Sequence, residues 1–480
     1  MSKVYDRIYG ASPISVQNFL VTLYGRKLIK QRFGRVYAAA LRHYVTKDYS
    51  NAAAEAELQN AELRRLLRHA VDHSAFYREL YAGIDVDSIR TVADLARLPV
   101  VEKEELRKNI DSVYTIRPED GILSFTGGTT GKSLMVVYTK DDFQTRMAYL
   151  DAFKTRCGVD PLNARKATFS GRSLATGIFQ GGRRIFWRAN RAFNQRLYST
   201  FDLREENLPA YLADLNRFRP EILNGFVSAI HQLAAYVQST GTKLAFRPKA
   251  IFTTSETLLP HHRELIERVF GAPIFDQYAS AEGAPFITEC PARNLHYNTD
   301  TGVIEAVDTP TGPEMLVTSF TSYGTPLIRY RIGDGVRFAS GTCPCGSSHP
   351  LVESIEGRAV DYLYSPERGR VSLSHLADVI KGLPNCVREM QFVQSEPRVV
   401  EVRIVVDEAG YGREAEEKIR TSMRYRFGSA MTFHIRKVDE IARESSGKFR
   451  LIKNSLPPGT FREAEGDADR APASSGAATA

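Results

Sequence analysis

The sequence lacks the apolar segments that a membrane-spanning or secreted protein would carry. No apolar run reaches the roughly 18–20 residues that a transmembrane helix needs. The first six residues, MSKVYD, have no apolar core of the kind found in a secretory signal. We therefore expect a cytoplasmic protein with no membrane partner. Cysteine is also scarce, with 5 in 480 residues, which argues against a disulfide framework.

Several familiar catalytic patterns are also missing. Neither HExxH nor GxSxG occurs, so the sequence indicates neither that class of zinc protease nor an α/β-type serine hydrolase. The net charge is +8, and the basic stretch 183–196 is better explained as a solvated face than as a nucleic-acid surface. A chain of this length buries more than one core, because single cores seldom extend past about 250–300 residues.

The most informative segment that is present is SFTGGTTGKS, residues 124–133. Glycines accept positive φ, so main-chain N–H groups can converge on an anion, while hydroxyls and Lys132 add donors and charge. The GxxxxGK[ST] pattern of GTPase-type loops fails by one residue, because Thr126 stands where its first glycine is required. A Gly/Thr cluster alone is also typical of an ordinary turn, so the phosphate interpretation depends on the motifs downstream.

Four motifs follow the loop in a fixed order. They are YASAE at 278–282, TPLIRYRIGD at 325–334, GRAVD at 357–361 and SSGKFR at 445–450. With the loop, they resemble the adenylate-forming superfamily of acyl-CoA synthetases, luciferases and nonribosomal adenylation domains. The segments 66–103 and 220–228 are similar to its phenylacetate-CoA ligase and CapK-like branch. The resemblance spans residues 60–455.

The resemblance implies an α/β fold of two domains. A large multi-layer N-terminal adenylation domain would cover residues 1–357, with a mainly helical outer region at 1–115, and a small mobile α+β lid domain would cover 358–463. The residue pattern agrees, because it predicts helices at 52–67 (continuing toward His73), 228–239 and 411–427, and strands at 135–138, 250–254 and 400–404. The tail at 464–480 is rich in Ala, Ser, Asp and Gly and is expected to be disordered.

The activity implied by the resemblance is ATP-dependent activation of a small carboxylic acid. Attack of the carboxylate on the α-phosphate gives an acyl-adenylate, from which AMP can leave, whereas the free acid would have to expel oxide. Negative charge builds on the transferring phosphorus and on pyrophosphate, so donors, a lysine and Mg²⁺ should dominate catalysis. The branch favours an aromatic or another small organic acid.

The resemblance also assigns roles in nucleotide binding. The β- and γ-phosphates would be held by Thr126, Gly127, Gly128, Thr129, Thr130, Gly131 and Lys132. Glu282 would ligate Mg²⁺, which suits a hard carboxylate oxygen. Asp334 would accept hydrogen bonds from the ribose hydroxyls. The sequence around Asp334, Gly-Asp-Gly, is by itself equally typical of a hairpin turn, but its place after LIRYRI favours the site.

Further assignments concern the walls of the site and the moving parts. Ser255 and Glu256 resemble the family's adenine and acyl wall, and Tyr278 would stack on the purine. The acid pocket would lie near Gly225, Phe226, Ser255 and Ser280. Arg358 would contact the nucleotide beside the hinge of the small domain. Lys448 would bridge the acyl carboxylate and the phosphate during adenylation.

The sequence indicates which molecule accepts the acyl group less clearly than it indicates that the acid is activated by ATP. The family usually carries an acidic residue or lysine two places after the hinge arginine, and Val360 stands there instead. Residues 364–372 also replace the loop that contacts the pantetheine arm of CoA. CoA is the commonest acceptor in the family, an amine acceptor would make an amide, and a non-catalytic nucleotide-binding scaffold is a third alternative.

The cysteines suggest a metal. Cys290, Cys343 and Cys345 lie near the motifs, and His296 would complete a Cys₃His tetrahedron suited to structural Zn²⁺. His349 is the alternative histidine. Unliganded buried thiols are the other interpretation, although similar clusters occur in this branch of the family.

Overall fold

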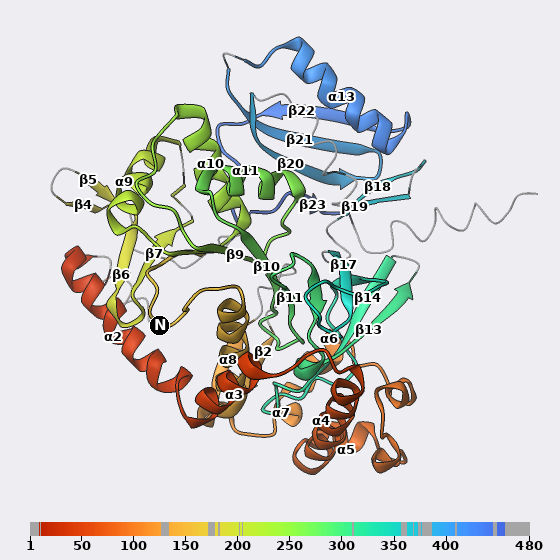
Figure 1. Ribbon diagram of the computed structural model, residues 1–480. Coiled ribbons are helices and arrows are strands. Elements are labelled where there is room, and N and C mark those ends of the chain that lie inside the picture. The colour runs from red at the N-terminus through yellow and green to blue at the C-terminus, as the bar shows by residue number, and fades with distance from the viewer. Residues whose placement is uncertain are drawn as a thin grey trace, which may run out of the picture. The chain divides into compact units, whose positions relative to one another are not determined.

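A computed structural model describes residues 9, 11–125, 134–170, 178–180, 183–200, 202–203, 205–309, 312–356, 362–367, 369–372, 376, 386–408, 410–444 and 449–456 (Figure 1). The chain divides into two compact units. The described residues through Glu356 belong to the larger unit, and those from Tyr362 to Leu456 belong to the smaller one.

The N-terminal part of the larger unit is helical. Its elements are α2 (Ile14–Arg32), α3 (Arg35–Thr46), α4 (Ala52–His73), α5 (Ala75–Leu80), α6 (Lys103–Lys108) and α7 (Ile110–Val113), with 3-10 turns η1 (Val86–Ser88), η2 (Val92–Arg97) and η3 (Pro118–Asp120). The predicted helix running from residue 52 toward His73 is confirmed as α4. The Asn51 side chain caps α4 by accepting from the Ala54 N–H. Leu63, Leu66 and Leu67 recur at helical spacing and are fully buried.

The centre of the larger unit is a sheet of 10 strands among the described residues, in the order β16-β17-β12-β11-β10-β9-β8-β3-β7-β6. Their bounds are β3 (Lys166–Ser170), β6 (Trp187–Asn190), β7 (Gln195–Ser199), β8 (Ile222–Gly225), β9 (Ala250–Thr254), β10 (Ile274–Tyr278), β11 (Ile287–Glu289), β12 (Leu295–Tyr297), β16 (Gly335–Ala339) and β17 (Leu351–Glu356). Strands β7, β3, β8, β9 and β10 are mutually parallel, and the strands on either side pair antiparallel. The predicted strand at 250–254 is confirmed as β9.

Helices cover both faces of this sheet. They are α8 (Lys140–Arg156), α9 (Leu208–Phe218), α10 (Val227–Thr240) and α11 (Pro260–Phe270). Alternate residues of β9 show the layering, because Ile251 joins the core that contains α10 and α11, whereas Phe252 joins a core with Phe153 of α8. The predicted helix at 228–239 is confirmed as α10. The helices α10 and α11 follow consecutive parallel strands and lie together in Figure 1.

Smaller sheets complete the larger unit. They are β1 (Ile122–Phe125) with β2 (Met135–Tyr138), β4 (Ile178–Gln180) with β5 (Arg183–Ile185), and β13 (Gly302–Thr309), β14 (Gly312–Ser319) and β15 (Tyr330–Arg331). The 3-10 turns are η4 (Arg191–Phe193) between β6 and β7, η5 (Glu205–Asn207) before α9, and η6 (Thr299–Thr301) before β13. The predicted strand at 135–138 is confirmed as β2.

The basic stretch at 183–196 is only in part the solvated face that its composition predicted, because Arg184 and Arg191 are exposed whereas Arg188 and Arg196 are not. Arg188 is fully buried, and its guanidinium donates to Gln17 of α2 at 2.6 Å and to the Trp187 carbonyl at 2.7 Å. Arg196 lies 3.3 Å from the buried carboxylate of Asp214. The helix α2 packs on β6, so Arg188 joins these two elements. Composition alone would have placed this arginine in solvent.

The smaller unit is an α+β structure. Its elements are β18 (Tyr362–Ser365), β19 (Gly369–Ser372), β20 (Val387–Glu396), β21 (Val399–Val406), α13 (Arg413–Phe427), β22 (Thr432–Lys437) and β23 (Ile452–Asn454), with the four-stranded order β22-β21-β20-β23. Ile419, Met423 and Phe427 recur every four residues on α13 and are fully buried against the sheet core. The predicted strand at 400–404 and helix at 411–427 are confirmed, as is the α/β class of the whole chain.

Among the residues that the structure describes, no helix combines the length and the apolar character needed to cross a bilayer.

Candidate functional site

The YASAE segment forms a tightly held loop between β10 and β11. The Ser280 hydroxyl accepts from the N–H groups of Gly283 and Ala284 at 3.2 and 3.0 Å. The buried Arg146 of α8 donates to the carbonyls of Gly283 and Ala284 at 2.9 and 3.2 Å. It also donates to the Thr321 hydroxyl at 2.7 Å. Four of these five hydrogen bonds end on the backbone of Gly283 and Ala284 and fix it next to Glu282.

Glu282 is a buried carboxylate with an unused oxygen. The residue is 3% exposed, and Oε1 accepts no hydrogen bond from the described part of the chain. The ammonium of Lys103 lies 3.8 Å from it, too far for a hydrogen bond. A buried carboxylate without donors is costly, whereas a hard divalent cation binds just such an oxygen. The predicted role of Glu282 as a Mg²⁺ ligand therefore fits its surroundings.

Tyr278 and Asp334 meet although they are 56 residues apart. The Tyr278 hydroxyl donates to Asp334 Oδ2 at 2.7 Å. Asp334 immediately precedes β16, which pairs with β17, while β15 pairs with β14. The Gly-Asp-Gly sequence is therefore not the turn of a β15–β16 hairpin. Gly333 has φ +86°, a conformation that favours glycine. The phenol orients the carboxylate, while stacking of Tyr278 on a purine stays a prediction.

Ser255 and Glu256 lie directly after β9. Ser255 has φ +67°, which is uncommon for a residue with a side chain. The Glu256 carboxylate accepts from the N–H of Ser228 at 2.7 Å and from its hydroxyl at 3.0 Å. A negative charge is favourable there because Ser228 lies in the first turn of α10. Glu256 thus joins β9 to α10, and its contact with nucleotide stays a prediction.

Gly225 and Phe226 are packed tightly at the end of β8. Gly225 has φ +142°, and a Cβ added there would lie 2.0 Å from the carbonyl oxygen of Phe169. Phe226 is 7% exposed and belongs to the core around α10. The fold thus accounts for both residue types by packing, and contact with an acyl substrate stays a prediction.

Replacing Gly225 with alanine is expected to destabilise the protein. The added methyl group meets backbone rather than a flexible side chain, so the cost should exceed the roughly 1–3 kcal/mol typical of overpacking. Gly241→Ala is the matched control, because Gly241 also has positive φ (+64°) but open space around it. Thermal unfolding should show a clearly larger fall in Tm for Gly225→Ala, and equal falls would contradict the close approach.

Nine of the predicted site residues lie outside the described residues. They are Thr126, Gly127, Gly128, Thr129, Thr130, Gly131, Lys132, Arg358 and Lys448. The strands that flank the phosphate-loop sequence are described, and they pair with Phe125 opposite Met135.

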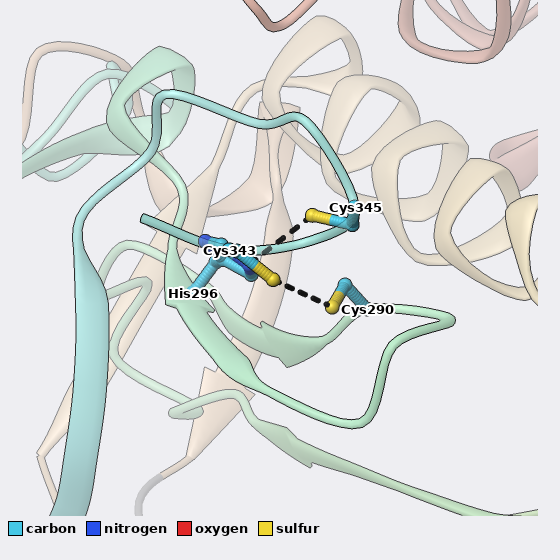
Figure 2. Close-up of side chains that lie close together, drawn as sticks. All are labelled: Cys290, His296, Cys343 and Cys345. Atoms are coloured by element: carbon cyan, nitrogen blue, oxygen red, sulfur yellow. Dashed lines mark hydrogen bonds between the residues drawn. The ribbon is translucent and has the colours of Figure 1, made fainter. Parts of the chain in front are cut away.

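The four predicted zinc ligands converge on one point, as Figure 2 shows. Cys290 follows β11, His296 lies on β12, and Cys343 and Cys345 lie between β16 and β17. Their ligand atoms are all within 4.8 Å of one another. The Cys290 and Cys343 sulfurs are 3.6 Å apart, close to the about 3.8 Å edge of a tetrahedron with 2.3 Å Zn–S bonds. The donor set and its geometry fit a closed Zn²⁺ site.

The second layer around this cluster favours His296 over His349. His296 donates from Nδ1 to the carbonyl of His349 at 2.9 Å, which leaves Nε2 facing the Cys345 sulfur at 3.5 Å. The imidazole of His349 instead pairs with buried Glu55 at 3.1 Å. Lys47 compensates Glu55 at 2.8 Å. His349 thus links the cluster to α4 and supplies a carbonyl, not a ring nitrogen.

Comparison with known proteins identifies the family. Protein CapK of Staphylococcus aureus is 33% identical over 452 residues, which cover 94% of this chain and 99% of that protein. The chain belongs to the CapK family. The CapK C-terminal domain family matches residues 363–455, within the smaller unit. Phenylacetate-coenzyme A ligase of Thermus thermophilus is 26% identical over 387 residues, covering 76% of this CapK-family chain and 81% of that enzyme.

Solved structures agree on the fold of this CapK-family protein. The crystal structure of 2-hydroxyisobutyryl-CoA ligase in the postadenylation state, in complex with 2-HIB-AMP, aligns with a TM-score of 0.69. The alignment covers 90% of this chain and 94% of that enzyme at 17% identity. The fold is therefore that of the adenylate-forming enzymes, and the resemblance drawn from the motifs is confirmed.

Two residues beside Glu282 escaped the sequence analysis. Arg146 belongs to none of the motifs, and the buried face of α8 on which it lies also carries Asp142 and Asp151, so its charge gives no distinct signal. Lys103 ends the segment 66–103, whose resemblance to the branch gives this lysine no role. Nothing local to either residue identifies its partner, because both act across more than 130 positions of sequence.

Proposed function

We propose that this CapK-family protein activates a small carboxylic acid with ATP and transfers the acyl group to the thiol of CoA. The observation that carries the proposal is Glu282, a buried carboxylate with an oxygen left free among the described residues, and the Tyr278–Asp334 pair supports it. The relationship to phenylacetate-CoA ligases supports the reaction class.

The described side chains suit the nucleotide half of this reaction. Asp334, oriented by the Tyr278 phenol, has acceptors for both ribose hydroxyls. Glu282 would hold Mg²⁺, which neutralises charge on the phosphate chain when bound. Arg146 is buried and keeps the loop of Glu282 in place through the Gly283 carbonyl. The loop with Thr126, Thr129, Thr130 and Lys132 would hold the β- and γ-phosphates by backbone and hydroxyl donors.

The roles proposed for Lys448 and for the small domain are based on the sequence motifs. Lys448 would bring its ammonium to the acyl carboxylate and the α-phosphate, where two anions must approach each other. The domain from residue 358 would act as a lid that turns about the segment at Arg358 and admits the thiol for the second step.

Zinc would have a structural role in this proposal. Cys290, His296, Cys343 and Cys345 are four protein ligands and leave no open position for a substrate. Reduced thiols and a thiol acceptor both suit the cytoplasm, which we keep as the proposed location.

An amine is the second candidate acceptor, and one observation favours it. Val360 and residues 364–372 depart from the family's pattern at the hinge and at the loop that contacts pantetheine. A non-catalytic scaffold accounts less well for Glu282, because burying a carboxylate without hydrogen-bond donors serves no purpose in packing.

The proposed function is tested by acid-dependent ATP–pyrophosphate exchange over aryl, hydroxy, amino and short aliphatic acids. At least one acid is expected to support exchange, and CoA should then accelerate AMP release. Lys448→Ala should lower exchange by about 100-fold, the typical effect of losing one electrostatic donor, with ATP binding retained. Stimulation by amines alone would move the protein to amide synthesis. Unchanged exchange in Lys448→Ala would contradict the role given to that lysine.

A further inference from the structure

We propose that Lys103 is a ligand of the β- and γ-phosphates, and that it leaves Glu282 for them when metal and nucleotide bind. This inference rests on the proposed function and deepens it. It adds a contact with the leaving group from the helical N-terminal region, outside the phosphate-loop sequence and outside Lys448.

The backbone beneath Lys103 is held in place by the motif that ends at Asp334. Val101 forms a parallel bridge in which its N–H donates to the Arg329 carbonyl at 3.1 Å, and Arg331 donates back to the Val101 carbonyl at 3.0 Å. Lys103 follows two residues later as the first residue of α6. The base of its side chain is therefore fixed relative to the same segment that positions Asp334.

The head of the Lys103 side chain is free to move. Its Nζ is 3.8 Å from Glu282 Oε1, so it compensates the charge without making a hydrogen bond. The Lys103 side chain is 27% exposed, whereas that of Glu282 is 4% exposed. Among the described residues Lys103 has no second partner. The ammonium thus stands at the boundary between a buried carboxylate and solvent, on a flexible four-carbon stem.

The charges of the metal and of the phosphates determine the position of the Lys103 ammonium when these ligands bind. A divalent cation on Glu282 repels Lys103, because both cations compete for the same oxygen. The phosphates that accompany the metal offer the ammonium new anionic partners nearby. Lys103 and Glu282 would therefore pair without ligands and separate once metal and nucleotide bind.

This exchange would help the reaction at the leaving group. An oxygen of the acid forms a bond to the α-phosphorus, the bond from that phosphorus to the bridging oxygen breaks, and the electron pair leaves with pyrophosphate. A cation on the β- and γ-phosphates stabilises the charge that develops there. Lys103 stays protonated throughout and transfers no proton.

The test compares ligands that contain or lack the outer phosphates. Binding of AMP and of magnesium pyrophosphate to the full chain is measured by calorimetry for wild type, Lys103→Met and Lys103→Arg. Lys103→Met should weaken pyrophosphate binding by about 10-fold or more and lower exchange by about 100-fold, as expected for one charge-assisted contact. AMP affinity should stay within about 2-fold, because AMP has only the α-phosphate. Lys103→Arg should restore part of the pyrophosphate affinity.

Lys108→Met is the matched control. Lys108 is the last residue of the same helix and is exposed, so the charge change is identical while both affinities should equal wild type. If Lys103→Met weakens AMP and pyrophosphate equally, or leaves pyrophosphate unchanged, the role of Lys103 is overturned and the proposed function stands. If wild type binds neither ligand and shows no exchange, both are overturned.

Discussion

Replacing Glu282 with glutamine is expected to lower acid-dependent ATP–pyrophosphate exchange by about 1,000-fold, which corresponds to about 4 kcal/mol of lost transition-state stabilisation. Glutamine keeps the shape of the side chain and removes the charge that would hold a divalent cation. Raising the Mg²⁺ concentration should recover little of the loss, because the amide oxygen is a poorer ligand for a hard cation. The measurement is exchange as a function of free Mg²⁺ at saturating acid.

The same substitution should not destabilise the protein. Glu282 is buried, one of its oxygens has no donor among the described residues, and its compensating Lys103 stands at 3.8 Å. Removing an under-compensated buried charge is neutral or stabilising, so Tm should stay the same or rise. Glu282→Gln should therefore lower the exchange activity without lowering Tm. This is expected where a site holds a charge that is compensated only when its ligand binds.

Glu289→Gln is the matched control for Glu282→Gln. Glu289 is as deeply buried, but it accepts from Arg263 at 3.0 Å and from the Asp276 N–H at 2.8 Å. The substitution should lower Tm, because the half-buried Arg263 loses its nearest charged partner and keeps only the Ile274 carbonyl and the more distant Glu267. The exchange activity of the folded fraction should persist. Retained exchange in Glu282→Gln, within about threefold of wild type, would remove the central support for the proposed function.

Local patterns in the sequence predicted more of the structure than contacts between distant segments did. Elements with a local repeat were predictable, since the 3.6-residue spacing on α4 and the alternation along β21 are properties of short windows. Motif order indicated the fold and named Tyr278, Glu282 and Asp334 as site residues. It did not indicate that the phenol of Tyr278 bonds Asp334, because that depends on how two distant segments meet.

Charged residues were the least predictable. Arg188 and Arg196 looked solvent-facing by composition, yet Arg188 is fully buried against α2. Sequence named His296 as the fourth ligand of the metal cluster but left His349 as an alternative. The distinction depends on which ring nitrogen meets which carbonyl, and spacing along the chain carries no information about ring orientation.

Replacing Cys343 with serine is expected to remove bound zinc and to lower the Tm of the larger unit by about 5 °C or more, since about 1 kcal/mol corresponds to about 2–4 °C in domains of 150–250 residues. The ligands come from three separate segments at one edge of the main sheet, so the ion joins β11 and β12 to the loop between β16 and β17. Losing a thiolate also leaves the Asn294 side chain, which donates to Cys343 at 3.3 Å, without its charged acceptor.

Cys157→Ser is the control that separates zinc from the loss of any thiol. Cys157 is half-buried, burial raises the pKa of its thiol to about 12, and it lies outside the cluster. Metal analysis should find one zinc per chain in wild type and in Cys157→Ser and none in Cys343→Ser. Chelation of wild type should reproduce the fall in Tm, because the binding free energy of a structural ion is part of the folding free energy. Two outcomes would contradict the zinc site. Either Cys343→Ser keeps its zinc, or the wild-type protein contains no zinc even when zinc is present during purification. The four residues would then be an unliganded thiol cluster.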